Sequence, residues 1–151
     1  MPNEILLISI KPKYAEQIFK GEKTVELRRV KTRLTTGDLV LVYVTSPKQA
    51  LIGYFTVKKV VLVENLQDNL QKLWQQVEEK ACLEYTEFKN YYQGASTGVG
   101  IFINNFYLFN SLIELQTLKQ KFPNFHPPQS YHYLNSEKTN ILEEIAGCKL
   151  L

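Results

Sequence analysis

The chain has 151 residues, of which 44% are hydrophobic and 22% charged. This composition is that of an ordinary globular protein and argues against disorder, and the length fits one domain over residues 1–151. Its longest apolar runs are the length of a strand, which excludes a membrane-spanning helix, and the N-terminal residues show no secretion signal, so we expect a cytoplasmic protein. Cys82 and Cys148 stand alone in the sequence and are expected to be reduced thiols.

Positive charge is concentrated in the first part of the chain. The net charge is only +3, yet residues 1–63 carry 11 Lys and Arg against 5 Asp and Glu. Such a concentration attracts anionic ligands and argues for a phosphate-bearing partner. Composition alone, however, favours the alternative of a solvated lysine-rich surface.

The first elements alternate between strand and helix patterns. Residues 4–10 are apolar and predict a buried strand. Pro12 suits the first turn of a helix that has an apolar stripe, and Gly21 is placed to end that helix. From Lys23 the apolar residues alternate with polar ones, which predicts a strand over residues 23–29. A turn at residues 36–38 leads into a further strand over residues 39–44.

The rest of the chain predicts long strands, three more helices and one helical turn. Residues 50–63 are rich in β-formers, with Gly53 expected at a bulge or bend. The other expected elements are a helix over residues 66–81, a short helix over 86–92, a strand over 99–109, a loop-like region over 111–130 with a helical turn near 113–119, an edge strand over 131–134, and a last helix capped by Ser136 and ended by Gly147. Five or six strands with inserted helices indicate an α+β fold built on a small curved or closed sheet.

The segment Gly21 to Arg29 carries the most chemistry. On the predicted strand Thr24, Glu26 and Arg28 share one side, and Lys23 precedes them in the turn. The Arg28 guanidinium can bind a phosphate or a base edge, and the Glu26 carboxylate can accept a hydrogen bond from an exocyclic amine. The alternative is a solvent-facing strand on which Glu26 and Arg28 form an ion pair of little energetic weight.

The remaining polar motifs give weaker indications. His126 and His132 have no metal-ligand spacing with the cysteines, so we expect two scattered surface histidines, no metal site and no cofactor. Tyr131 could supply a ring that stacks on a base, although a tyrosine packed on the core explains the same pattern. No glycine motif cradles a phosphate, and no serine or cysteine nucleophile has a visible base.

Three motifs together resemble the opening of an ASCH domain, which belongs to the PUA-like superfamily. They are the strand and helix over residues 6–18, the pattern Gly21-x-Lys23-x-x-Glu26-x-Arg28, and Thr36-Gly37-Asp38-x-Val40. Ser46-Pro47, the Trp74 helix and residues 127–131 extend the likeness to a prokaryotic branch of the family and to nearly the whole chain. The resemblance implies a PUA-like β-barrel of five to six strands with flanking helices around a cleft lined by Lys23, Glu26 and Arg28.

The same resemblance implies a role in RNA binding, RNA processing or translation-linked regulation, and the family also contains enzymes. One branch resembles amidohydrolases of acylated cytidine, in which the lysine works with a threonine three positions later and a glutamate from the next helical region. Here Glu26 occupies the threonine position, and an ungapped match places Ala81 at the glutamate. Another branch is associated with RNA cleavage.

We therefore predict a domain that binds RNA or a nucleotide through Lys23, Glu26 and Arg28. Lys11 and Lys13 are predicted phosphate contacts, and Thr24 and Tyr131 are predicted additions to the ligand site. Whether the domain is an enzyme stays open, with binding ranked above hydrolysis because a nearby Glu26 favours a charged Lys23 that cannot take a proton. If the cleft is catalytic, Lys23 and Glu26 are the expected catalytic residues. We expect no membrane partner, and the oligomeric state is open.

Overall fold

The computed structural model describes residues 4–122 and 124–150, and within them six strands and five helices follow one another as the sequence predicts. In chain order they are β1 (Ile5–Ile10), α1 (Pro12–Phe19), β2 (Val25–Arg28), β3 (Leu39–Val44), β4 (Ala50–Glu64), α2 (Leu66–Val77), α3 (Tyr85–Tyr91), β5 (Thr97–Glu114), α4 (Leu115–Lys121), β6 (Tyr131–Tyr133) and α5 (Ser136–Ala146).

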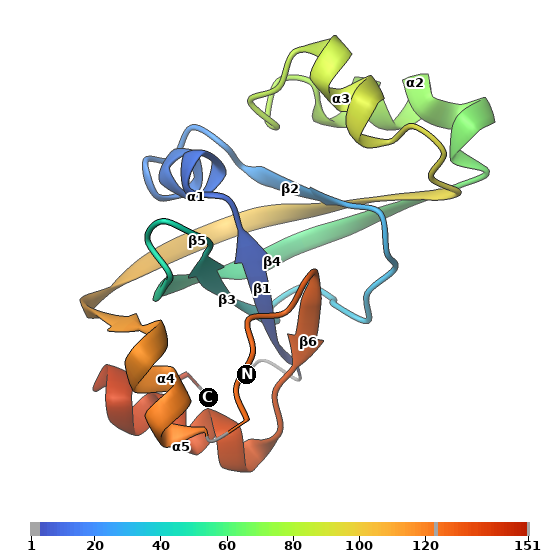
Figure 1. Cartoon of the computed structure of the whole chain (residues 1–151). Coiled ribbons are helices and arrows are strands. Elements are labelled where there is room, and N and C mark those ends of the chain that lie inside the picture. The colour runs from blue at the N-terminus through green and yellow to red at the C-terminus, as the bar shows by residue number, and fades with distance from the viewer. Residues whose placement is uncertain (1–3, 123, 151) are drawn as a thin grey trace.

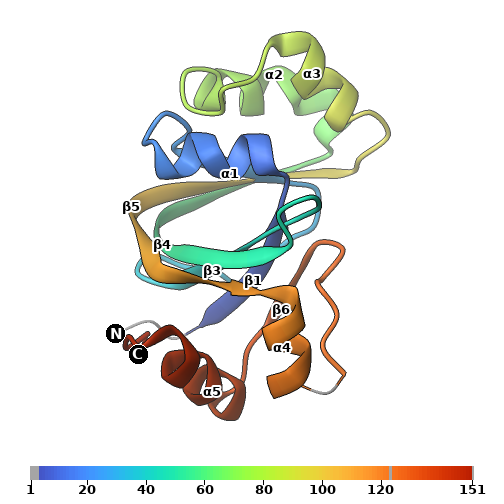
Figure 2. The same cartoon turned by 60° about the vertical axis from the view of Figure 1, so that its left-hand side comes forward.

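The strands form one mixed sheet that curls into a half-barrel. Their order is β2-β5-β4-β3-β1-β6, in which β1 and β3 run parallel and the other neighbours antiparallel. In both views α2 and α3 lie at one end of the curled sheet and α4 and α5 at the other (Figures 1 and 2). The α+β, PUA-like fold class predicted from the sequence is confirmed, and β6 is the expected edge strand.

Three apolar clusters fill the spaces between these layers. One lies inside the curl of the sheet and includes Ile8, Val42 and Phe55, and the others lie beneath the α2–α3 pair and the α4–α5 pair. The sheet bends where the β4–β5 register shifts between Leu51 and Gly53. A Cβ at Gly53 would lie 2.1 Å from the Tyr107 carbonyl oxygen, so only glycine allows this close approach.

Some element boundaries differ from the predictions. β5 continues to Glu114, where a loop was expected from residue 111, because Ile113 and Glu114 still pair with Leu51 and Ala50. α4 then begins at once with Leu115. The N-cap of α5 is Asn135, whose side-chain oxygen accepts from the Lys138 backbone N–H, so the predicted Ser136 cap was wrong by one residue.

Other predictions hold as stated. Gly21 and Gly147 have the positive φ angles of helix-ending glycines, +80° and +71°. Cys82 and Cys148 are both free thiols. Across residues 4–122 and 124–150, none of the helices has the length and apolar character needed to cross a bilayer.

Candidate functional site

A cavity of about 470 Å³ opens between α1, β2, α3 and the segment before β6. It is lined by Ser9, Ile10, Lys11, Tyr14, Lys23, Glu26, Leu27, Arg28, Thr45, Leu83, Glu87, Tyr91, Pro127, Pro128 and Gln129. We call this cavity the charged cleft. The strand alternation that the sequence predicts for β2 is the reason that Glu26 and Arg28 enter it together.

Lys23 is a buried lysine at the base of the charged cleft. Its side chain is only 3% exposed, and its ammonium donates a 2.7 Å hydrogen bond to the Ala81 carbonyl oxygen and lies 5.2 Å from the Tyr14 ring centroid. Burial lowers the pKa of Lys23 below its ordinary value, and the Glu26 carboxylate opposes that shift without cancelling it. The expectation that Glu26 would keep Lys23 charged underestimated how deeply the lysine is buried.

Arg28 ties three parts of the site together. Its Nη2 donates to Glu26 Oε2 at 2.7 Å and to the Ser9 carbonyl oxygen of β1 at 2.7 Å, and its Nε donates to Glu26 Oε2 at 3.1 Å. Its Nη1 lies 3.5 Å from the Ser130 carbonyl oxygen. The side chains of Arg28 and Glu26 are 11% and 7% exposed, so their ion pair is buried and does not lie on a solvent-facing strand.

Two residues of α3 reach the cleft and were missed in the sequence. Glu87 and Tyr91 are spaced i, i+4, so both face the cleft from one side of the helix. The Tyr91 hydroxyl donates to the Leu27 carbonyl oxygen at 3.2 Å, and burial raises its pKa. The i, i+4 spacing was visible in the sequence, and the family resemblance implied a glutamate from a helical region, but the ungapped match put Ala81 in its place.

The predicted ligand residues divide into two groups. Lys11, Lys23, Glu26 and Arg28 line the charged cleft. Lys13, Thr24 and Tyr131 are not among its lining residues. The Thr24 backbone bonds to Lys80 and Ile103, and the Tyr131 hydroxyl donates to the Lys31 carbonyl oxygen at 2.5 Å. The roles proposed for these three in ligand binding stay predictions.

The two histidines are closer together than the sequence suggested, since His126 and His132 line one second cavity. Over residues 4–122 and 124–150, no three His, Cys, Asp or Glu side chains gather as metal ligands. The charged groups that line the charged cleft are the Lys23 amine with its lowered pKa, the Lys11 ammonium, the Arg28 guanidinium and the carboxylates of Glu26 and Glu87.

Comparisons with known proteins find close relatives. The ASCH domain family model matches residues 8–143. A curated protein of Zymomonas mobilis, named an ASCH domain-containing ribonuclease, is 29% identical over 141 residues, which cover 93% of this chain and 91% of that protein.

Solved structures show the same fold. The crystal structure of ASCH from Zymomonas mobilis superposes with a TM-score of 0.83 at 27% identity, over 93% of this chain and 94% of that one. A serine-to-alanine variant of that protein gives a TM-score of 0.84 at 26% identity, over 96% and 99% of the two chains. A Leishmania major protein at 14% identity and a TM-score of 0.59, over 95% and 94% of the two chains, shares the fold alone.

Removing the Arg28 charge should destabilise the chain strongly. Arg28→Met leaves the buried Glu26 carboxylate unpaired, and we expect it to lower the free energy of unfolding by about 3–5 kcal/mol. Adding Glu26→Leu should recover most of that loss, because the buried charge is then gone. Urea denaturation measures both variants.

Lys20→Met is the matched control, because it breaks the exposed Lys20–Glu16 pair and should leave the free energy of unfolding nearly unchanged. An Arg28→Met protein as stable as the wild type would show that the ion pair does not hold the site together.

Proposed function

This chain belongs to the ASCH domain family, and we propose that it is a ribonuclease that cleaves RNA in the charged cleft. The observation that carries the proposal is Lys23, a buried amine whose pKa is lowered and which shares a cavity with a guanidinium. The Lys23 amine can lose its proton, whereas the Arg28 guanidinium keeps its charge. Such a pair is suited to acid–base catalysis on a phosphodiester. The ribonuclease named among the relatives adds support.

This proposal reverses the ranking drawn from the sequence, in which binding stood above hydrolysis. That ranking rested on the missing or displaced catalytic partners and on a charged Lys23, and burial works against the charge. RNA binding remains part of the proposal, because a substrate must dock before it is cut. The basic residues at the start of the chain, including Lys11 at the cleft, would neutralise its phosphates.

In this mechanism neutral Lys23 is the general base. One of its N–H groups donates to the Ala81 carbonyl oxygen, which fixes the amine and leaves its lone pair for a ribose 2′-hydroxyl. The amine takes the 2′-hydroxyl proton, and the 2′-oxygen forms a bond to the adjacent phosphorus. The bond from phosphorus to the 5′-oxygen breaks, and the departing oxygen takes a proton from water. The hydroxide left behind takes the proton from the Lys23 ammonium, which regenerates the neutral amine. The products are a 2′,3′-cyclic phosphate and a 5′-hydroxyl end.

Arg28 would stabilise the negative charge that develops on the phosphate oxygens in this step. Nε and Nη2 donate to Glu26 and Ser9, while among residues 4–122 and 124–150 Nη1 makes only the long contact to Ser130, which would leave its second N–H for a ligand. Because the other bonds hold the guanidinium in place, it needs little reorganisation when the charge appears. Glu87 at the opposite wall could accept hydrogen bonds from a base or a ribose.

A second candidate function is hydrolysis of an acylated cytidine. The observation that favours it is that Glu87 lines the same cleft as Lys23, whereas the ungapped sequence match had put Ala81 in the place of a glutamate. Ala81 instead supplies the carbonyl that Lys23 binds. Glu26 still stands where that chemistry uses a threonine, so RNA cleavage is the first candidate.

Lys23→Arg should abolish cleavage, because a guanidinium keeps positive charge but cannot lose a proton near neutral pH. We expect the rate on a single-stranded RNA to fall about 10²–10⁴-fold. In the wild type the rate should rise with pH through the lowered pKa of Lys23, and that rise should be missing from any residual activity of the variant.

Lys20→Arg, purified in parallel, is the matched control, because Lys20 is an exposed residue at the C-terminal end of α1 and both preparations carry the same contaminating nucleases. Wild-type cleavage by Lys23→Arg would reject Lys23 as the base.

The substrate series separates the candidate reactions. An RNA with one 2′-deoxy position should resist cleavage at that position, since the attacking hydroxyl is missing, and the other products should end in 2′,3′-cyclic phosphates. N4-acetylcytidine should be left intact. Cleavage at the deoxy position contradicts the proposed step, and release of acetate from N4-acetylcytidine without RNA cleavage favours the second function.

A further inference from the structure

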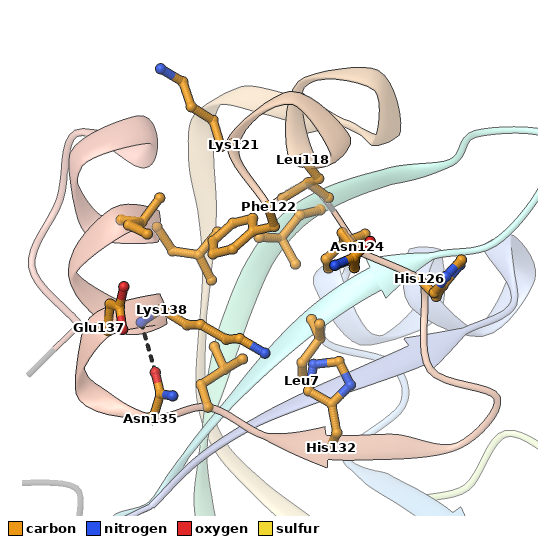
Figure 3. Close-up of a pocket in the computed structure, with 15 residues that line it drawn as sticks. Leu7, Leu118, Lys121, Phe122, Asn124, His126, His132, Asn135, Glu137 and Lys138 are labelled. Atoms are coloured by element: carbon orange, nitrogen blue, oxygen red, sulfur yellow. Dashed lines mark hydrogen bonds between the residues drawn. The ribbon is translucent and has the colours of Figure 1, made fainter.

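A second cavity lies in the C-terminal part of the molecule, and nothing in the proposed reaction uses it. Its volume is about 520 Å³, and it lies between α4, α5 and β6 against the sheet (Figure 3). A cavity of this size accommodates a small organic ligand. We call it the α4–α5 pocket.

The inner surface of the α4–α5 pocket is apolar. Leu7, Leu51, Leu118 and Leu142 line it, and each is at most 3% exposed. Phe122 adds an aromatic ring that the close-up shows among these side chains (Figure 3). A ligand seated here must present an apolar body, because a polar group against leucine side chains would lose its hydrogen bonds to water without replacement.

One edge of the pocket is cationic. The Lys138 side chain reaches across from α5 so that its ammonium lies toward His132 of β6, while the Glu137 carboxylate lies apart from it (Figure 3). Within residues 4–122 and 124–150 the Lys138 ammonium forms no ion pair. Lys121 lies at the outer rim, and His126 lies at the wall formed by the segment after α4.

The surroundings of His132 favour its uncharged form. Burial and the nearby Lys138 charge both lower its pKa, so at neutral pH the imidazole offers one N–H donor and one acceptor. A neutral donor beside a free ammonium is a pair that an anionic oxygen can bind at the same time.

We propose that the α4–α5 pocket binds a small organic anion that has an apolar body and one anionic head group. The head group binds Lys138 and His132, and the apolar body packs on the leucines below them. A nucleotide is a poorer occupant, because its base edge carries several polar atoms that the leucine floor cannot satisfy. The proposal does not depend on the ribonuclease activity.

Decanoate is a suitable probe, with decanol and AMP as comparisons, and titration calorimetry of the full chain measures binding. We expect saturable binding of decanoate, at least about tenfold weaker binding of decanol, and about tenfold weaker decanoate binding in Lys138→Gln, because each comparison removes the charge-assisted contact. Lys119→Gln should bind like the wild type, since Lys119 lies on α4 but does not line the pocket.

A second variant tests the apolar part. Ile141 is a partly exposed lining residue of α5, and Ile141→Trp should fill the cavity and abolish decanoate binding while thermal unfolding stays cooperative. No binding of decanoate, equal affinity in Lys138→Gln, or binding of AMP in preference to decanoate would each overturn the proposal.

Discussion

The Arg28 guanidinium is the contact on which the candidate site depends. The sheet is only half of a barrel, and β2 at one edge has no strand partner on its outer side. Arg28 bridges that opening, because it leaves β2 and donates to the Ser9 carbonyl oxygen of β1. Hydrogen bonds from Tyr131 to Lys31 and from Arg33 to Tyr133 close the same side further along. The two sheet ends are thus joined by side chains, and the gap that a strand would have filled is the charged cleft.

The same arrangement sets the chemistry of Lys23. A buried ammonium is costly, and the nearby Arg28 charge lowers the pKa of Lys23 further, while the nearby Glu26 carboxylate raises it. Glu26 makes its short hydrogen bonds to Arg28, which leaves burial as the dominant influence on the lysine. The ion pair thus closes the sheet, while burial is the main cause of the lowered pKa of Lys23.

The segment over residues 124–129 forms walls of both the charged cleft and the α4–α5 pocket, so the two cavities share one loop.

Local patterns in the sequence predicted the elements and four of the residues that line the charged cleft, Lys11, Lys23, Glu26 and Arg28. Alternation along β2 placed Glu26 and Arg28 on one face, and Gly21 marked where α1 ends and Lys23 begins the turn. What depends on packing between distant segments could not be predicted. Glu87 and Tyr91 belong to a helix about 60 residues away, and the α4–α5 pocket joins His126 and His132 to residues of four elements. The direction of the Lys23 pKa shift could be found only from the depth of its burial, because the nearby Glu26 carboxylate by itself would raise the pKa.

The central claim is that Lys23 is an amine which loses its proton more easily than an ordinary lysine. Nitrogen NMR of the lysine side chains, with Lys23→Arg used to assign the resonance, follows that proton directly as pH is raised. We predict a midpoint below the ordinary value of 10.5 for Lys23, and a still lower midpoint in Glu26→Gln, because the Glu26 carboxylate opposes the shift most strongly. A Lys23 midpoint at or above the ordinary value would contradict the account.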